Sequence, residues 1–208
     1  PELLDEATLA DALLHPQDRA YSVPELFEFI ERGGLTFGRW LRQAPYTLRC
    51  GVFPNIPQAS RMARLPLSEQ YAAVELFRGT MVRHSVIVYR NDSASRPQPI
   101  SFAGDAWLDY VPIRMPDTVC AQDQLPSGAV AVLINRSHTY TDLIQPIGPT
   151  EKRLFDAVDG ERRIRDILDR TMSALQRTTN LDIARSFFER LWWQDQVVFD
   201  ASAQPKVV

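Results

Sequence analysis

The amino-acid sequence predicts an α+β protein. A capped helix runs into a glycine pair and a strand between residues 22 and 41, and a continuous apolar run covers residues 128–135. After residue 150 the pattern changes to three short amphipathic helices and a final strand, which is a winged-helix-like order of elements. We therefore predict a mixed α/β N-terminal part and a winged-helix-like C-terminal domain, with boundaries at 1–92, a loop-rich β segment at 93–149, and 150–208.

Composition sets the outer limits on function. Of the 208 residues, 45% are hydrophobic and 24% are charged, as in ordinary globular proteins. The net charge of −3 argues against a general nucleic-acid binder, which needs a basic surface to release phosphate counterions. No apolar run approaches the ~20 residues of a membrane-spanning helix, so we predict a cytoplasmic protein without a membrane partner. In that compartment Cys50 and Cys120 are expected as reduced thiols rather than as one disulfide.

The N-terminal part begins with two predicted helices. Leu3–Leu14 carries apolar residues at helical spacing. In the second helix Ser22 and Glu25 have the spacing of a capping box, in which the hydroxyl accepts from a first-turn amide and the carboxylate reaches back to the cap. Gly33-Gly34 ends this helix, because glycine adopts a left-handed cap without strain. A strand over Leu35–Leu41 follows.

A second helix-and-strand pair completes residues 1–92. The connection Cys50–Pro66 is punctuated by prolines, which mark turns. A helix is then predicted from Leu67 to about Val82, weakened near its end by Gly79. The β-branched and aromatic residues of His84–Arg90 predict a strand.

Residues 93–149 are rich in proline and short of long periodic runs. We predict short strands at Ile100–Phe102 and Asp109–Ile113. Gly128–Asn135 is consistent with a strand buried on both faces or with the first helix of the next unit, and periodicity does not separate the two.

The C-terminal part is predicted to hold three helices and a strand. Thr150 is the expected N-cap of the first helix. The second helix is predicted over Arg162–Met172, and Asn180 or Asp182 is expected to cap the third. Gln196–Phe199 is the predicted final strand.

No motif for metal binding or nucleophilic catalysis is present. The three histidines, His15, His84 and His138, lack the one-turn spacing of a zinc face, and there is no G-x-S-x-G elbow. Basic residues between 152 and 177 alternate with acidic ones, which favours a salt-bridged surface over a nucleic-acid patch. Of Trp192-Trp193, one indole is expected in the core and the other at a domain contact.

Several segments resemble one family. Asp18, Arg19, Tyr21, Ser22, Pro24, Glu25 and Leu26 match the start of the last helix in bacterial class I S-adenosylmethionine-dependent methyltransferases with a C-terminal region of the methyltransferase regulatory domain type. Glu69–Arg90, Arg136–Leu143 and Phe187–Asp200 are similar to the same group. The resemblance implies that residues 22–90 form the far edge of a methyltransferase sheet, with His84–Arg90 as its final strand. The D-G pair after the first C-terminal helix resembles the small peptide-chaperone winged helices of the pyrroloquinoline quinone pathway.

The cofactor-binding element of that family is missing from the sequence. A strand running into a glycine-rich turn and helix would hold the cofactor, and no G-x-G triplet occurs here. We therefore expect the C-terminal, substrate-recognition or regulatory portion of a longer methyltransferase, inactive alone and without a cofactor of its own. S-adenosylmethionine would belong to the full-length protein. The alternative is a winged-helix-like module that binds a peptide or protein without enzymatic activity.

The resemblance also implies candidate site residues and partners. Arg19 and Tyr21 would border the methyl acceptor, with Gln43 and Tyr46 as second choices. Against this, Arg19 could pair with Asp18 or a helix end, and Tyr21 could pack on Phe27. The expected partners are an upstream methyltransferase domain and a methyl acceptor that is a protein or a small molecule. Pairing of an orphan strand at His84–Arg90 with another chain would give a homo-oligomer.

Overall fold

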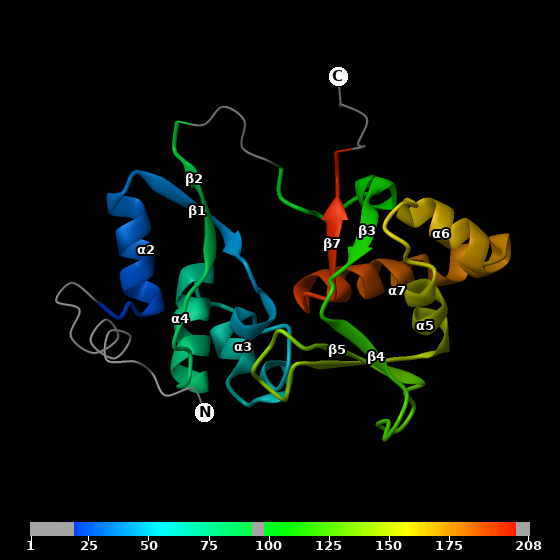
Figure 1. The fold of residues 1–208 in the computed structure, drawn as a ribbon, viewed down its shortest axis with the longest axis horizontal. Helices are drawn as coiled ribbons and strands as arrows, with labels where there is room; N and C mark the ends of the chain where they lie inside the picture. The colour runs from blue at the N-terminus through cyan, green and yellow to red at the C-terminus, as the bar shows by residue number, and fades with distance from the viewer. Residues whose placement is uncertain (1–18, 93–97, 203–208) are drawn as a thin grey trace, which may run out of the picture.

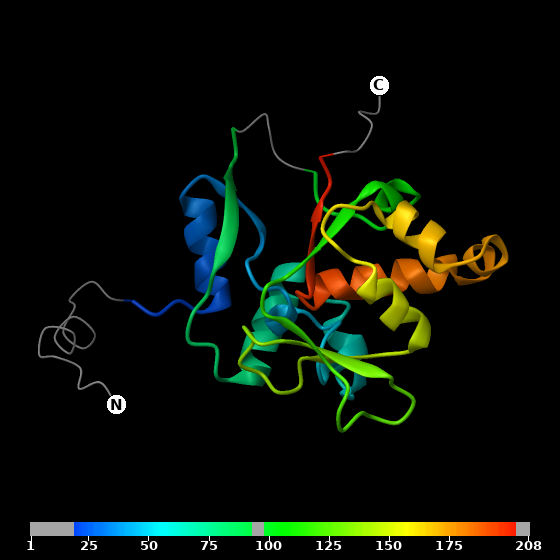
Figure 2. The same cartoon turned by 45° about the vertical axis from the view of Figure 1, so that its right-hand side comes forward.

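The computed structural model describes residues 19–92 and 98–202, and its class is α+β, as predicted. The helices of the N-terminal half and a two-stranded sheet lie at one end of the molecule, and the C-terminal helices with two small sheets lie at the other (Figure 1). Turning the molecule by 45° keeps these two groups distinct (Figure 2). The predicted helix Leu3–Leu14 lies outside the described residues. No helix in the described ranges has the length and apolarity needed to cross a bilayer.

The N-terminal group starts with helix α2 (Val23–Arg32), which begins and ends as predicted. The capping box forms, with the Glu25 carboxylate accepting from both the N–H and the hydroxyl of Ser22 at 2.9 Å. Gly34 takes the left-handed conformation (φ 65°) that turns the chain into strand β1 (Leu35–Trp40). Strand β2 (Val86–Arg90) pairs antiparallel with β1. The segment predicted as an orphan strand therefore has a partner within the chain.

Helix α4 (Leu67–Arg78) is shorter than predicted. It ends at Gly79, whose φ of 63° stops the helix four residues before the predicted end. Short helices η1 (Ala44–Tyr46), η2 (Phe53–Asn55) and α3 (Ala59–Met62) precede it. One aromatic cluster fills the space between β1, α2 and α4. Its buried members are Val23, Trp40, Tyr46 and Tyr71.

The segment between the two groups differs from the prediction. Ile100–Phe102 is not a strand, because the Tyr110 hydroxyl bonds both backbone groups of Ser101, at 3.2 and 3.1 Å. Helix η3 (Ala106–Asp109) takes the start of the second predicted strand, which forms as β3 (Val111–Arg114).

A three-stranded antiparallel sheet follows, built from β4 (Thr118–Ala121), β5 (Ala131–Asn135) and β6 (Ile144–Ile147). The apolar run that sequence periodicity left undecided is the middle strand β5, and four of its five residues are buried.

The C-terminal helices are α5 (Pro149–Asp156), α6 (Ile164–Thr171) and α7 (Ala174–Trp193), followed by β7 (Val197–Asp200). Thr150 is not the N-cap of α5. Gly148 occupies that position, because the Glu151 carboxylate accepts its N–H at 2.9 Å. Asn180 and Asp182 lie inside α7 and do not cap it.

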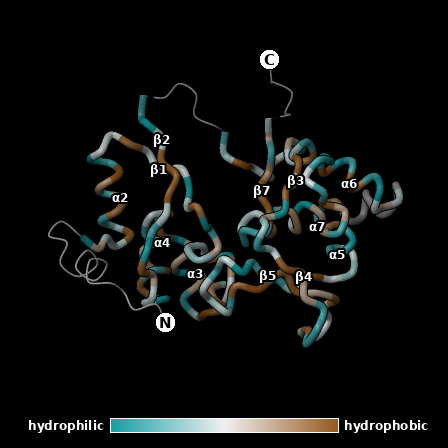
Figure 3. Tube along the Cα trace, viewed as in Figure 1, coloured by the Kyte–Doolittle hydropathy of each residue, from teal (hydrophilic) through white to brown (hydrophobic). Residues whose placement is uncertain are grey.

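One core serves residues from both predicted parts 93–149 and 150–208. Trp107 and Leu133 from the first are buried in the same cluster as Ile167, Phe187 and Leu191 from the second. Figure 3 shows hydrophobic segments of β5, β7 and α7 meeting in this region. Strand β7 pairs antiparallel with β3, which precedes the three helices. The winged-helix-like order of elements stays a prediction.

Candidate functional site

The four candidate residues occupy two separate places. Arg19 and Tyr21 lie at the start of α2, where the guanidinium is 2.9 Å from the Glu25 carboxylate and 5.0 Å from the Tyr21 ring. Tyr21 packs on Phe29 at 5.5 Å between ring centroids, not on Phe27 as the alternative expected. Asp18, the other expected partner of Arg19, lies outside the described residues. The bonds from Ser22 and then from Arg19 lower the pKa of Glu25 to about 2. These contacts cap α2.

Gln43 and Tyr46 lie at η1, in the centre of the molecule, and both are buried. The Gln43 amide donates to the carbonyl of Trp192 at 3.4 Å, which places it at the contact between the two groups of elements. The Tyr46 ring stacks on Trp40, with ring centroids 3.7 Å apart and planes 4° from parallel. This stacking holds the phenol in one orientation.

A chain of three polar side chains starts at Tyr46. Its hydroxyl lies 2.8 Å from Nδ1 of His84, and Nε2 of His84 lies 3.1 Å from Oε1 of Glu75. The second oxygen of Glu75 accepts the N–H of Val23 at 2.8 Å. The side chains of His84 and Glu75 are 9% and 15% exposed. Burial raises the pKa of Tyr46, so the phenol stays protonated. A hydroxyl oriented by a histidine that is itself oriented by a carboxylate is the arrangement that general acid–base chemistry uses.

Tyr46 also belongs to the wall of a cavity of about 500 Å³. Its walls come from segments 41–46, 80–85 and 137–140, so that both groups of elements contribute. Arg42, Arg83 and His138 are the basic residues of the lining, and none of the lining residues is acidic. A second cavity of about 660 Å³, between α2, β1 and α4, is lined by Glu28, Glu31 and Glu69 and by none of the candidate residues.

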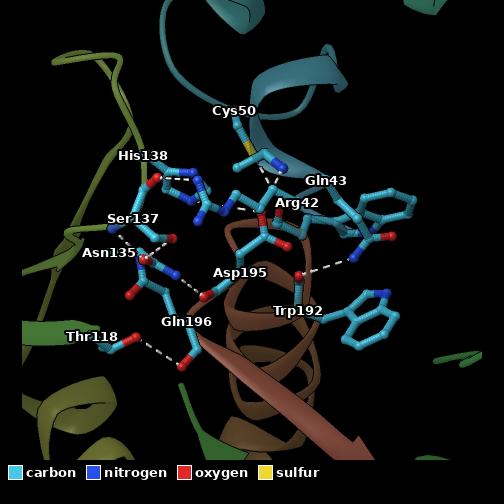
Figure 4. Close-up of polar contacts among 12 residues, drawn as sticks. Arg42, Gln43, Cys50, Thr118, Asn135, Ser137, His138, Trp192, Asp195 and Gln196 are labelled. Atoms are coloured by element: carbon cyan, nitrogen blue, oxygen red, sulfur yellow. Dashed lines mark hydrogen bonds and ion pairs between the residues drawn. The ribbon is translucent and has the colours of Figure 1, made fainter. Parts of the chain in front are cut away.

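Asp195 lies among the polar side chains at the contact between the two groups of elements (Figure 4). Its carboxylate accepts the N–H of Ala44 at 2.9 Å, and its backbone carbonyl accepts the side-chain amide of Asn135 at 2.5 Å. Burial raises the pKa of Asp195 to about 6, although the Ala44 and Gln43 amides oppose the change. Nε2 of His138 lies 3.6 Å from this carboxylate, and burial lowers the pKa of that histidine.

A buried ion pair stands beside the cavity. Arg78, whose side chain is 5% exposed, donates to Asp142 at 3.1 Å and to the carbonyl of Pro45 at 2.9 Å. Its guanidinium also lies 4.1 Å from the centre of the Tyr140 ring. The hydrogen bond from Arg78 lowers the pKa of Asp142, while burial acts in the opposite direction and is the largest single influence. Arg78 thus fixes η1 and the loop before β6 against one another.

Both tryptophans of the pair in α7 lie at the contact between the two groups. Arg39 stands over Trp192 at 4.7 Å and Arg49 stands over Trp193 at 4.9 Å. Neither ring is fully buried, but Trp193 packs against the buried side chains of Ala44, Cys50 and Leu143. The prediction of one indole in the core and the other at a domain contact therefore agrees with the structure in part, because both rings also accept a guanidinium.

Sequence reasoning missed most of the polar residues that surround Tyr46. The spacing of His84 and His138 in the sequence argued only against a zinc face, and Glu75 and Asp195 carry no motif. No sequence signal connects them, because contacts across the fold bring them together. Within residues 19–92 and 98–202, no group of three His, Cys, Asp or Glu side chains is placed to hold a metal ion, and the thiols of Cys50 and Cys120 are free.

The chain matches no model of a known protein family.

Proposed function

We propose that this chain is the C-terminal substrate-recognition or regulatory portion of an S-adenosylmethionine-dependent methyltransferase, and that the methyl acceptor binds beside Tyr46. The position of Tyr46 carries the proposal. The motif resemblance assigns it to the acceptor side, and the residue lies in a cavity wall with its hydroxyl held by His84. Of the other candidates, Gln43 precedes η1 and donates to the carbonyl of Trp192. Arg19 and Tyr21 lie at the start of α2.

The order of elements is a second support. Helix α2, β1 and β2 occur in the order expected of the last helix, the penultimate strand and the final strand of the resembled fold, with η1, η2, α3 and α4 inserted before β2. Among the described residues β1 and β2 pair only with each other, which leaves a sheet edge for the strands of an upstream methyltransferase domain. That domain would supply the cofactor site, and the assembled protein would be cytoplasmic.

The Tyr46 chain suggests how the acceptor is oriented. Because the Glu75 carboxylate only accepts hydrogen bonds, a neutral His84 carries its hydrogen on Nε2 and accepts the Tyr46 hydroxyl at Nδ1. The phenol oxygen keeps a lone pair for an N–H or O–H of the acceptor. Methyl transfer is an in-line displacement in which positioning supplies much of the rate, so a fixed phenol is a suitable guide.

The test begins with the coding sequence upstream of Pro1. We expect a strand that runs into a glycine-rich turn, and we expect the longer protein to bind S-adenosylmethionine in a calorimeter. The 208-residue chain, titrated in the same way, should give no binding heat. Tight binding by the 208-residue chain would mean that the cofactor site is misplaced, and a longer protein that does not bind the cofactor would overturn the proposal.

A pull-down separates the proposal from the alternative binding module. The proposal predicts that association with a methyltransferase domain depends on the β1–β2 edge. If α5–α7 and β7 instead retain a peptide or protein partner when that edge is blocked by lysine substitutions, the module is the better description.

A further inference from the structure

We propose that the cavity beside Tyr46 binds a small organic acid, whose carboxylate lies between Arg42 and Arg83 and whose apolar body lies against Pro45 and Tyr46. Naming this acid as the methyl acceptor rests on the proposed function. The binding itself does not depend on it.

The charge of the lining is the first argument. Arg42 and Arg83 both line the cavity, and no aspartate or glutamate does. In the part of the chain that the structure describes, neither guanidinium forms an ion pair, whereas Arg78 behind the wall is paired with Asp142. Arg42 donates from Nη1 to the carbonyl of Ser137 at 2.6 Å, so its guanidinium links two of the segments that line the cavity. Arg42 also acts to lower the pKa of Asp195, a carboxyl group that does not line the cavity.

The ring of His138 is the second argument. Its side chain is 2% exposed, and it forms part of the cavity wall. The Gln194 carbonyl is close enough to influence its pKa, but neither ring nitrogen has a hydrogen bond of normal geometry with the described residues. Nε2 has only the longer contact of 3.6 Å with the Asp195 carboxylate. A buried polar group without a well-formed hydrogen bond is costly, and a ligand oxygen in the cavity would reduce that cost.

The apolar part of the wall fixes the class of ligand. Leu41 and Val82 line the cavity and are 56% and 98% exposed, so their side chains face water until something covers them. Pro45, Tyr46 and Tyr140 add flat apolar surface. A guanidinium presents paired N–H donors that match the two oxygens of a carboxylate. The combination suits an acid with an aromatic or short aliphatic body better than a free inorganic anion.

The experiment is a titration of the intact chain with three sodium salts (benzoate, 4-hydroxybenzoate and hexanoate) followed by calorimetry and by amide chemical shifts. Two compounds serve as controls. Methyl benzoate has the aromatic ring of benzoate without the negative charge, and inorganic phosphate has negative charge without an apolar part. We expect at least one acid to bind and to shift amides of segments 80–85 and 137–140. The neutral ester and phosphate should bind about tenfold more weakly or not at all.

Variants test the two arginines. Arg42→Gln and Arg83→Gln should each weaken acid binding by about tenfold or more, whereas Arg64→Gln, which removes an exposed arginine outside the cavity, should leave it unchanged. Within residues 19–92 and 98–202 the Arg83 side chain forms no hydrogen bond or ion pair, so Arg83→Gln keeps the test informative if Arg42→Gln unfolds. Failure of all three acids to bind, equal binding of the ester or of phosphate, or full binding by Arg83→Gln and Arg42→Gln would each overturn the inference.

The outcome is separable from that of the proposed function. If no acid binds but the longer protein binds S-adenosylmethionine, only this inference fails. If an acid binds and the longer protein does not bind the cofactor, only the methyltransferase proposal fails.

Discussion

Asp195 lies at the end of α7, where its backbone is left-handed (φ 53°) and turns the chain into β7. Aspartate and asparagine tolerate this conformation better than most residues. The turn points the carboxylate at the N–H of Ala44, 2.9 Å away. One residue thus ends a helix and binds a loop from the other group of elements.

Substituting Asp195→Asn should change how stability depends on pH. In the wild type the folded-state pKa of about 6 lies above the unfolded value of ~4, so the folded chain binds the proton more tightly. The stabilisation from this group is full at low pH and falls as pH rises towards 6, by about 3 kcal/mol in total. The asparagine variant keeps the backbone turn and loses this dependence.

Urea unfolding of both proteins at about pH 4 and about pH 7.5 measures the effect. The free energy of unfolding of wild type minus that of the variant should be larger at the lower pH and smaller at the higher pH. A constant difference across this range would show that Asp195 titrates normally.

Tyr46→Phe tests the hydrogen-bonded chain of Tyr46, His84 and Glu75. The change removes only the hydroxyl and should leave the stacking on Trp40 intact, but Nδ1 of the buried His84 loses its partner. We expect a loss of about 1 to 3 kcal/mol in the free energy of unfolding. Tyr21→Phe is the matched control and should stay within about 0.5 kcal/mol of wild type. Equal stability of Tyr46→Phe and wild type would argue against the hydrogen bond.

At the scale of elements, a bulge in β1 sets the shape of the N-terminal group. The register shifts between Phe37 and Arg39, so that Gly38 adds one residue to the strand. Phe37 and Trp40 consequently both face the aromatic cluster under α2 and α4. Arg39 faces the opposite side, where it reaches Trp192. The bulge therefore lets β1 contact the aromatic cluster on one side and Trp192 on the other.

Gly38→Ala should disrupt this strand. A Cβ at that position would lie 2.5 Å from Cε2 of Tyr89 and 2.9 Å from the Ile87 carbonyl oxygen, so β1 and β2 would have to separate. We expect about 1 to 3 kcal/mol of destabilisation in thermal or urea unfolding. Gly33→Ala, whose nearest atoms would be 3.4 Å away, serves as the control. A Gly38→Ala variant as stable as this control would exclude the close contact.

Elements with strong local signals could be predicted from the sequence. The capping box and glycine pair bound α2, and β-branched residues marked β2, because these signals lie within the element itself. The predicted element or its boundary was wrong where contacts outside the element determine the backbone conformation. The Tyr110 hydroxyl takes the backbone groups of Ser101 away from a strand. Helix α7 begins at Ala174, so that two residues with capping propensity, Asn180 and Asp182, lie inside it.

The candidate site was predictable only in part. Tyr46 and Gln43 come together with η1 because they are close in sequence. The distance from Tyr46 to His84 in sequence is 38 residues, and that from Ala44 to Asp195 is 151. No periodic pattern encodes such contacts, so the histidine, the aspartate and the cavity between them emerge only from the fold.

At the scale of the whole molecule, charged and polar contacts join the two groups of elements. Arg78 reaches Asp142, Arg49 reaches Glu189 at 2.6 Å, and Arg42 reaches the Ser137 carbonyl. Only the first of these guanidiniums is buried. Its pairing with Asp142 should therefore contribute most to holding the groups together, because solvent weakens the exposed contacts.

Arg78→Ala should be strongly destabilising. It leaves Asp142, 22% exposed, without its partner, and it frees the carbonyl of Pro45. Removing one member of a buried pair costs about 3 to 5 kcal/mol. Denaturant unfolding is the measurement. Arg90→Ala breaks an exposed pair with Asp92 and should cost no more than about 1 kcal/mol. Similar losses in the free energy of unfolding of the two variants would show that the buried pair stabilises the protein no more than the exposed pair.

The pairing of β3 with β7 has a consequence for biosynthesis. A ribosome delivers the chain from its N-terminus, and early segments begin to fold first. Here Val111 pairs with Asp200, and the Ala44 amide is bound by Asp195, so these two segments lack their partners until residues 195–200 have been synthesised. Until then β3 offers an open edge to other nascent chains or to chaperones. A stop codon just after residue 195 would leave α7 complete and remove β7, yet we expect its product to be degraded like one from a much earlier stop.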